Sequence, residues 1–343
     1  LPMRPGWAPK KVSGSEHPVA LATNVTVFMK RGTQSAMQEI VECVMNVSEG
    51  RDAAKLEAIA AEIEALPSAF LLSCAADPDH HRSVLSFIGT PASILEAAFG
   101  AVKKAVQLID LRTHRGVHPR IGAVDVIPFV PIRGVSMQEC EAIARRLGKR
   151  IAQELQVPVY LYGEAATRVE RRDLSVIRKG QFEGLVQEIK VNRAKKPDFG
   201  PNSLHPTAGA TMIGARRPLI AYNICLNTSD DVVARKIAAR IRESGGGIPG
   251  VKALGFYIDS KGLSQVSMNV TEYHETSLLK IFKRVGEEAR RFQTEVVCSE
   301  IVGLVPQGAL RKVMIRTLKL ENFHSSQILE KRIAEVLKRT MEQ

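Results

Sequence analysis

Short apolar runs alternate with segments of helical periodicity along most of this 343-residue chain, and this alternation constrains the fold more than any other feature. Strand-like runs occupy residues 39–47, 83–89, 123–132 and 157–163. Between the first two, Leu56, Ile59 and Ile63 recur at helical spacing. After residue 218 the same rhythm restarts. Strands interleaved with helices predict an α/β (α+β) protein.

A long irregular segment interrupts this rhythm between about residues 164 and 214. It is rich in Arg, Lys, Pro and Gly, and a loop of this length in a compact protein is usually functional or disordered. We therefore predict two subdomains, at 38–217 and 218–343, each with a mixed β-sheet and helices on its outer face. A cleft between two such units is a natural place for a ligand.

The net charge of +12 favours an anionic partner. The basic residues are scattered and no RNP, zinc-finger or phosphate-loop motif accompanies them, so nucleic acid is the weaker interpretation. No apolar run approaches the ~18 residues of a transmembrane helix, and we expect no membrane partner. The cysteines lie in or beside apolar runs without CxxC spacing, as buried free thiols do: Cys43, Cys74, Cys140, Cys225 and Cys298. This pattern predicts a reducing, cytoplasmic location.

The first 36 residues lack the pattern of the rest. We expect residues 1–36 to be a disordered or mis-called leader, so that Trp7 adds nothing to the core. The alternative is a weak export or organelle signal, but Thr23, Asn24 and Thr26 interrupt its apolar part.

His118 is the sharpest catalytic candidate, in the stretch RTHRGVHPRIGAVDVIPFVPIRGVSMQE. Imidazole titrates near neutrality and is the usual general acid or base. Gly116 lets the backbone turn, Pro119 restricts the preceding residue to extended geometry, and Arg120 adds a fixed charge. This context predicts a positioned, exposed histidine. The alternative is a turn histidine without a role.

Other polar residues give weaker signals. His80 and His81, with nearby Asp77 and Asp79, resemble a metal cluster, but adjacent residues of an extended chain point in opposite directions, so no metal is expected. We interpret the isolated histidines as loop or surface residues: His114, His205, His274 and His324. Several arginines suit carboxylate binding or are solvated charges: Arg112, Arg120, Arg133, Arg216 and Arg217. The stretch ESGGGIPG lacks phosphate-loop residues and predicts a flexible connection.

Taken together, longer motifs carry a specific resemblance. The stretches IVECVMNVSEGRD, VPVYLYGEAA, PDFGP, GATMIGARRPLIAYNI and IVGLVPQGAL, with the His118 block, make the chain similar to the glutamate formiminotransferase family from about residue 37 to 313. The resemblance implies transfer of the formimino group of N-formimino-L-glutamate to N5 of tetrahydrofolate. It also implies facing sheets, a homodimer, and folate bound in the cleft between the subdomains. In animals the domain is fused to a cyclodeaminase, an activity that we do not expect here.

The resemblance also assigns residues. The histidine of the GxHPRxG motif, here His118, is the catalytic acid/base. The folate-binding loop aligns with Gly200, Pro201, Asn202, Ser203, Leu204, His205, Pro206, Thr207, Ala208 and Gly209. Arg120, Arg216 and Arg217 are candidates for the substrate carboxylates. Tetrahydrofolate acts as co-substrate without a metal, and a polyglutamate tail would suit the positive charge.

One departure from the family pattern affects the expected activity. Family members carry aspartates where this chain has Ser73 and Ala75. The alternatives are therefore a formyl-handling relative, either a glutamate formyltransferase or an enzyme similar to 5-formyltetrahydrofolate cycloligase, and a non-catalytic folate-binding protein. The intact GVHPRIGAVD block argues against the last.

Overall fold

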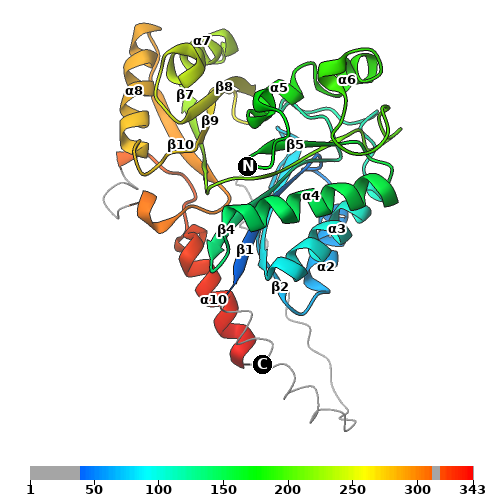
Figure 1. The fold of residues 1–343 in the computed structure, drawn as a ribbon. Helices are drawn as coiled ribbons and strands as arrows, with labels where there is room; N and C mark the ends of the chain where they lie inside the picture. The colour runs from blue at the N-terminus through cyan, green and yellow to red at the C-terminus, as the bar shows by residue number, and fades with distance from the viewer. Residues whose placement is uncertain (1–38, 311–316, 343) are drawn as a thin grey trace.

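Two β-sheets, each with helices packed on one face, form the protein (Figure 1). The structure is a computed structural model, and it describes residues 39–310 and 317–342. The predicted leader, residues 1–36 with Trp7, lies outside the described residues. The prediction of an α/β protein with two sheet-containing subdomains is confirmed.

The larger sheet has the strand order β2–β3–β1–β4–β6–β5 within the described residues. Its strands are β1 (Ile40–Val47), β2 (Ala69–Asp77), β3 (Arg82–Gly89), β4 (Val124–Arg133), β5 (Val159–Gly163) and β6 (Thr211–Ala215). The pairs β4–β6 and β5–β6 are parallel and the others antiparallel, so this sheet is mixed as predicted.

Helices α2 (Ala53–Glu64), α3 (Pro91–Leu108) and α4 (Met137–Glu154) cover one face of the larger sheet (Figure 1). Local sequence sets their starts. The Ser136 hydroxyl accepts a hydrogen bond from the Glu139 backbone N–H, and the Glu139 carboxylate accepts one from the Ser136 N–H, which is the capping box predicted at α4. Pro91 occupies the first turn of α3, where its missing N–H costs nothing.

The smaller sheet has the order β10–β7–β9–β8 and is antiparallel throughout rather than mixed. Its strands are β7 (Ile220–Leu226), β8 (Val251–Ile258), β9 (Leu263–Val270) and β10 (Val296–Val302). Helices α7 (Asp231–Ile241) and α8 (Leu278–Arg291) pack on its outer side (Figure 1). Its hairpin-like succession β8–β9 explains the antiparallel arrangement, because consecutive strands joined by a tight turn must run in opposite directions.

The last helix, α10 (Leu329–Glu342), leaves the smaller sheet and packs against the larger one. Its buried Leu329 and Ile333 form an apolar cluster with Ile40, Leu72 and Ile88. Arg332 of α10 donates a hydrogen bond from Nε to the Leu72 carbonyl at 2.7 Å. The helix thereby covers one end of the inner face of the larger sheet and leaves the other end open toward the smaller sheet.

The segment 164–214 was predicted to be irregular, and this prediction is wrong. It contains the short helices η1 (Val169–Arg172), α5 (Leu174–Arg178), α6 (Gln181–Glu188) and η2 (Arg193–Lys195), and it ends in β6. β6 and β2 are strands that the apolar pattern did not reveal. In the described part of the chain, no helix is long and apolar enough to cross a membrane.

Candidate functional site

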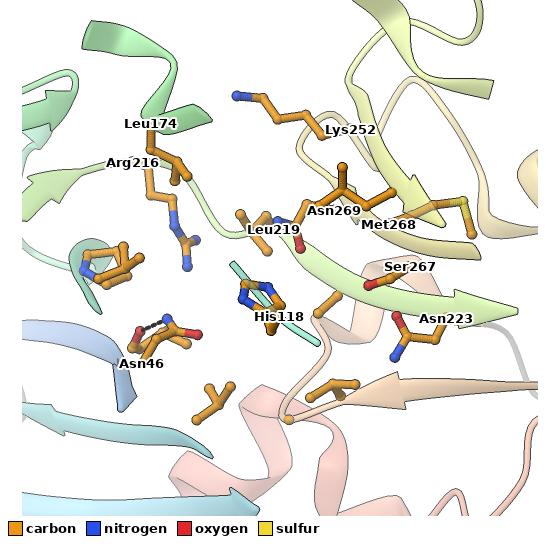
Figure 2. Close-up of a pocket in the computed structure, with 18 of the residues that line it drawn as sticks. Asn46, His118, Leu174, Arg216, Leu219, Asn223, Lys252, Ser267, Met268 and Asn269 are labelled. Carbon is orange, nitrogen blue, oxygen red and sulfur yellow. Dashed lines mark hydrogen bonds between the residues drawn. The ribbon is translucent and has the colours of Figure 1, made fainter. Parts of the chain in front are cut away.

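A cavity of about 540 Å³ lies between the inner faces of the two sheets. Both sheets contribute polar lining residues: Glu42, Asn46, Ser86, Asn223, Ser267 and Asn269. Figure 2 shows His118 near the centre of this view, with Asn46 on one side and Asn223 and Ser267 on the other. The volume is within the range of small-molecule sites.

His118 lies on the segment between α3 and β4 and is half-buried, so the prediction of an exposed histidine is wrong. Its Nδ1 is 2.8 Å from the Pro119 carbonyl oxygen. Arg82 Nη1 lies against the same edge of the ring, 2.5 Å from Nδ1 and 3.0 Å from Nε2.

A network around the buried Asp125 holds Arg82 beside His118. Arg82 donates from Nε to Asn46 Oδ1 at 3.0 Å, and its Nη1 lies 3.7 Å from Asp125 Oδ2. Asp125 also pairs with Arg178 at 2.6 Å and accepts a hydrogen bond from the Ile121 backbone N–H at 2.8 Å. One carboxylate therefore fixes two guanidinium groups and the chain just after the His118 motif.

This network sets the charge of His118. Burial, followed by the charges of Arg82 and Arg178, holds the pKa of His118 well below its usual value of 6.5. Burial, followed by the charge of Arg178, likewise lowers the pKa of Arg82 to about 9. The His118 ring is therefore neutral near pH 7, and its protonated form is more acidic than a free imidazolium.

The smaller sheet completes the surroundings of His118. Phe256 of β8 lies 6.3 Å from the His118 ring and packs edge-on against His80 at 5.5 Å, centroid to centroid. His80 is held by Asp77, whose Oδ2 is 2.7 Å from His80 Nδ1. Next to it, the Ser260 backbone N–H donates to Asp79 at 3.3 Å, which joins the β8–β9 turn to the β2–β3 turn.

Two histidines support the segment that carries His118. His81 and His114 stack with centroids 4.1 Å apart, and His114 Nε2 lies 2.8 Å from the His81 carbonyl. His114 lies in a loop, as one of the two interpretations had it, but it is buried rather than at the surface. A Cβ on Gly116 would lie 2.4 Å from the His80 carbonyl oxygen, so close approach, rather than free turning, requires glycine here.

Comparison with known proteins identifies the family. Residues 40–216 match the formiminotransferase domain, N-terminal subdomain, and residues 221–339 match the formiminotransferase domain. The chain belongs to the formiminotransferase family. A glutamate formimidoyltransferase of Streptococcus pyogenes serotype M1 is 43% identical over 295 residues, which cover 86% of this chain and 98% of the relative.

Two further relatives belong to the same family. A glutamate formimidoyltransferase of Thermoplasma acidophilum is 46% identical over 296 residues, covering 86% of this chain and 97% of that protein. The formimidoyltransferase-cyclodeaminase of Rattus norvegicus is 45% identical over 280 residues, covering 80% of this chain and 51% of that protein.

The structure separates the three predicted arginines of the formiminotransferase site. Arg216 lines the cavity, and Figure 2 shows its side chain reaching into it. Arg217 is exposed and is not part of the lining. Arg120 is buried outside the cavity, and its two terminal nitrogens each lie 2.8 Å from a carboxylate oxygen of Glu183. An arginine engaged in this way has little capacity left for a substrate carboxylate.

The predicted folate-binding loop, residues 200–209, is also not among the cavity-lining residues. It packs against the segment that carries His118. The Leu111 N–H donates to the Thr207 carbonyl at 2.8 Å, and the Ala123 N–H donates to the Ala208 carbonyl at 2.9 Å. The loop therefore supports the segment that carries His118, and its contact with folate remains a prediction.

Smaller predictions have mixed outcomes. Within residues 39–310 and 317–342, no group of three or more metal-ligating side chains is present. The five cysteines are free thiols, and Cys74 alone among them is half-buried rather than buried. The stretch predicted as a flexible connection begins with a 3₁₀ turn, η3 (Glu243–Gly245), whose Glu243 accepts a hydrogen bond from the Gly250 N–H at 3.1 Å. Glu243 and Ser244 also line the cavity.

Sequence reasoning missed four residues that form the site with His118: Asn46, Arg82, Asp125 and Arg178. A signal existed only for Asp125, a charged residue inside the otherwise apolar stretch AVDVIPFV. A buried carboxylate in a strand needs a cationic partner, so this residue predicts a nearby arginine without saying which one.

Proposed function

We propose that this protein is a glutamate formimidoyltransferase, which transfers the formimino group of N-formimino-L-glutamate to N5 of tetrahydrofolate. The observation that carries this proposal is a histidine held neutral by burial and two half-buried arginines, inside a cavity between two sheets, in a chain of the formiminotransferase family. The matches to two relatives of that name cover 98% and 97% of their lengths.

His118 moves one proton in two directions during the transfer. N5 of tetrahydrofolate attacks the amidine carbon of the donor, and the imidazole of His118 takes the proton from N5. The tetrahedral intermediate then collapses, and the protonated ring delivers this proton to the departing glutamate nitrogen. General acid–base catalysis of this kind contributes about 10²–10⁴-fold.

The neighbouring arginines favour the second half of this cycle. Their charges destabilise the protonated ring, so His118 returns its proton readily. The proton does not pass to bulk water as easily, because the ring is half-buried between Arg82 and Phe256. Holding the two substrates together in the cavity supplies much of the remaining acceleration.

Arg216 is the predicted arginine best placed for a substrate carboxylate, because its side chain enters the cavity. Residues 200–209 remain the proposed contact for the rest of folate. A homodimer and a cytoplasmic location are further proposals that rest on the resemblance. Light scattering at several protein concentrations tests the first.

A turnover assay with tetrahydrofolate tests the function, using formiminoglutamate and formylglutamate in separate reactions. We expect turnover with formiminoglutamate and a loss of about 10²-fold or more in kcat for His118→Ala. Because the family resemblance implies an aspartate where this chain has Ala75, turnover with formylglutamate alone would favour the formyl-handling alternative. Folate binding without turnover of either donor would refute the enzyme assignment.

A further inference from the structure

Glu42 is a buried carboxyl group that the proposed chemistry leaves without a role. It lies on β1, lines the cavity and is 4% exposed. In the described parts of the chain, no hydrogen bond or ion pair engages its carboxylate. Burying an unpaired carboxylate is costly, so such a group is either neutral or awaits a ligand with N–H donors.

The surroundings of Glu42 explain its state. On the neighbouring strand it faces Ile88, which belongs to the apolar cluster covered by α10. Burial raises the pKa of Glu42 to about 7, although the charge of Arg216 opposes this rise. Near neutral pH the group therefore exists in both forms, and a ligand that donates to the carboxylate would select the ionised one.

Position along the strand narrows the choice of ligand. Glu42 and Asn46 both line the cavity from β1, and four residues of strand separate them by roughly 13 Å. Asn46 contacts Arg82, which contacts His118, so the reacting atoms lie at the Asn46 end. The amidine carbon of the donor must be there as well. Glu42 is therefore too far away to bind the amidine of the donor.

The pyrimidine end of the pterin ring, opposite N5, is the part of tetrahydrofolate that suits the position of Glu42. A pterin ring with N5 beside His118 directs its 2-amino group and N3–H away from the reacting atoms, along the cavity. These are two parallel N–H donors, and a carboxylate accepts such a pair in bidentate fashion. The apolar surroundings strengthen both hydrogen bonds.

We propose that Glu42 recognises the 2-amino-4-oxo edge of the pterin ring and thereby sets the orientation in which N5 reaches His118. This assignment rests on the proposed function, because it takes tetrahydrofolate as the acceptor. It makes Glu42 a specificity-determining residue for the acceptor and not for the donor.

The test combines Glu42→Gln with a tetrahydrofolate analogue that carries hydrogen in place of the 2-amino group. The variant keeps the size of the side chain but replaces one acceptor with a donor. We expect the KM for tetrahydrofolate to rise about 10- to 100-fold in Glu42→Gln, while the KM for formiminoglutamate changes less than about threefold. Glu57→Gln, on the exposed side of α2, is the matched control and should behave as the wild type.

The analogue tests whether the Glu42 carboxylate and the 2-amino group of the pterin interact. In the wild type, loss of the 2-amino group should raise KM by a similar factor, and in Glu42→Gln it should add almost nothing. Equal discrimination by both proteins would overturn the proposal, as would a rise in the KM for the donor alone. If Glu42→Gln does not fold, the wild type alone still tests the proposal. Equal KM values of the wild type for tetrahydrofolate and the analogue would contradict the proposal. A wild type inactive with both donors refutes the proposed function and this inference with it.

Discussion

Replacing Arg82 tests the claim that its charge keeps His118 neutral. Arg82 Nη1 lies 3.0 Å from His118 Nε2. At this distance a unit charge opposes protonation by about 1.4 kcal/mol even at the dielectric constant of water, and by more in a buried site. The Asp125 carboxylate, whose Oδ2 lies 3.7 Å from Arg82 Nη1, cancels part of the effect. We therefore use the lower figure, which corresponds to about one pH unit.

Removing the charge of Arg82 should raise the pKa of His118. The pKa of wild-type His118 is held well below 6.5 by burial and the two arginines, so the base stays unprotonated as the pH falls through this value. In Arg82→Gln the ring should accept its proton at a higher pH, and the acid limb of kcat/KM should move up by about one pH unit.

The measurement is the pH profile of kcat/KM from pH 5 to 9 for wild type, Arg82→Gln and Arg82→Lys. The lysine variant keeps the charge but loses the fork that reaches Asn46, so its kcat should fall while the limb stays in place. Ionisation of the substrates is common to all three proteins and cancels in the comparison. An unchanged limb in Arg82→Gln, or an equal shift in both variants, would refute the electrostatic argument.

Two further predictions concern the segment that carries His118. Gly116→Ala should destabilise the protein by about 1–3 kcal/mol and lower kcat by up to about 10²-fold, because its Cβ would lie 2.4 Å from the His80 carbonyl oxygen. Gly286→Ala, in the open middle of α8, should instead be neutral or stabilising, and thermal unfolding with turnover compares the two. Burial lowers the pKa of His114 to about 4, so stability should fall as the pH drops from 6.5 toward 4, by up to about 1.4 kcal/mol per pH unit. Urea unfolding at pH 7 and pH 5 should show a smaller loss for His114→Gln, and an equal loss in both proteins would contradict this.

The sequence was sufficient for the elements with strong local signals. The helices α3 and α4 could be predicted from their N-terminal residues and their apolar periodicity. The fold class could be predicted from the alternation of strand-like and helical segments. β2 was not predicted, because its sequence, AFLLSCAAD, is rich in small residues and lacks the β-branched residues typical of strands. β6 is five residues long, and its place between β4 and β5 is decided by tertiary pairing alone.

The site was less predictable than the fold, because its parts come from distant segments. His118 could be found from a local motif. Arg82 is 36 residues away from it, and Arg178 is 53 residues from Asp125. In the sequence both arginines look like ordinary solvated charges. Only the folded chain shows that both lie half-buried against a shared carboxylate, Asp125.

The departure at Ala75 has a physical meaning in this arrangement. Ala75 lines the cavity two residues before Asp77 on β2, at a position where the family resemblance places an aspartate. With alanine there, Asp125 is the carboxylate that Arg82 and Arg178 share, and Asp77 is engaged by His80. The surroundings of His118 are therefore more positive than an aspartate at this position would make them. A more positive site weakens His118 as a base toward N5 but strengthens its protonated form as an acid toward the leaving nitrogen. In the proposed mechanism, alanine at this position therefore shifts the balance between the two proton transfers and leaves His118, the group proposed to perform them, in place.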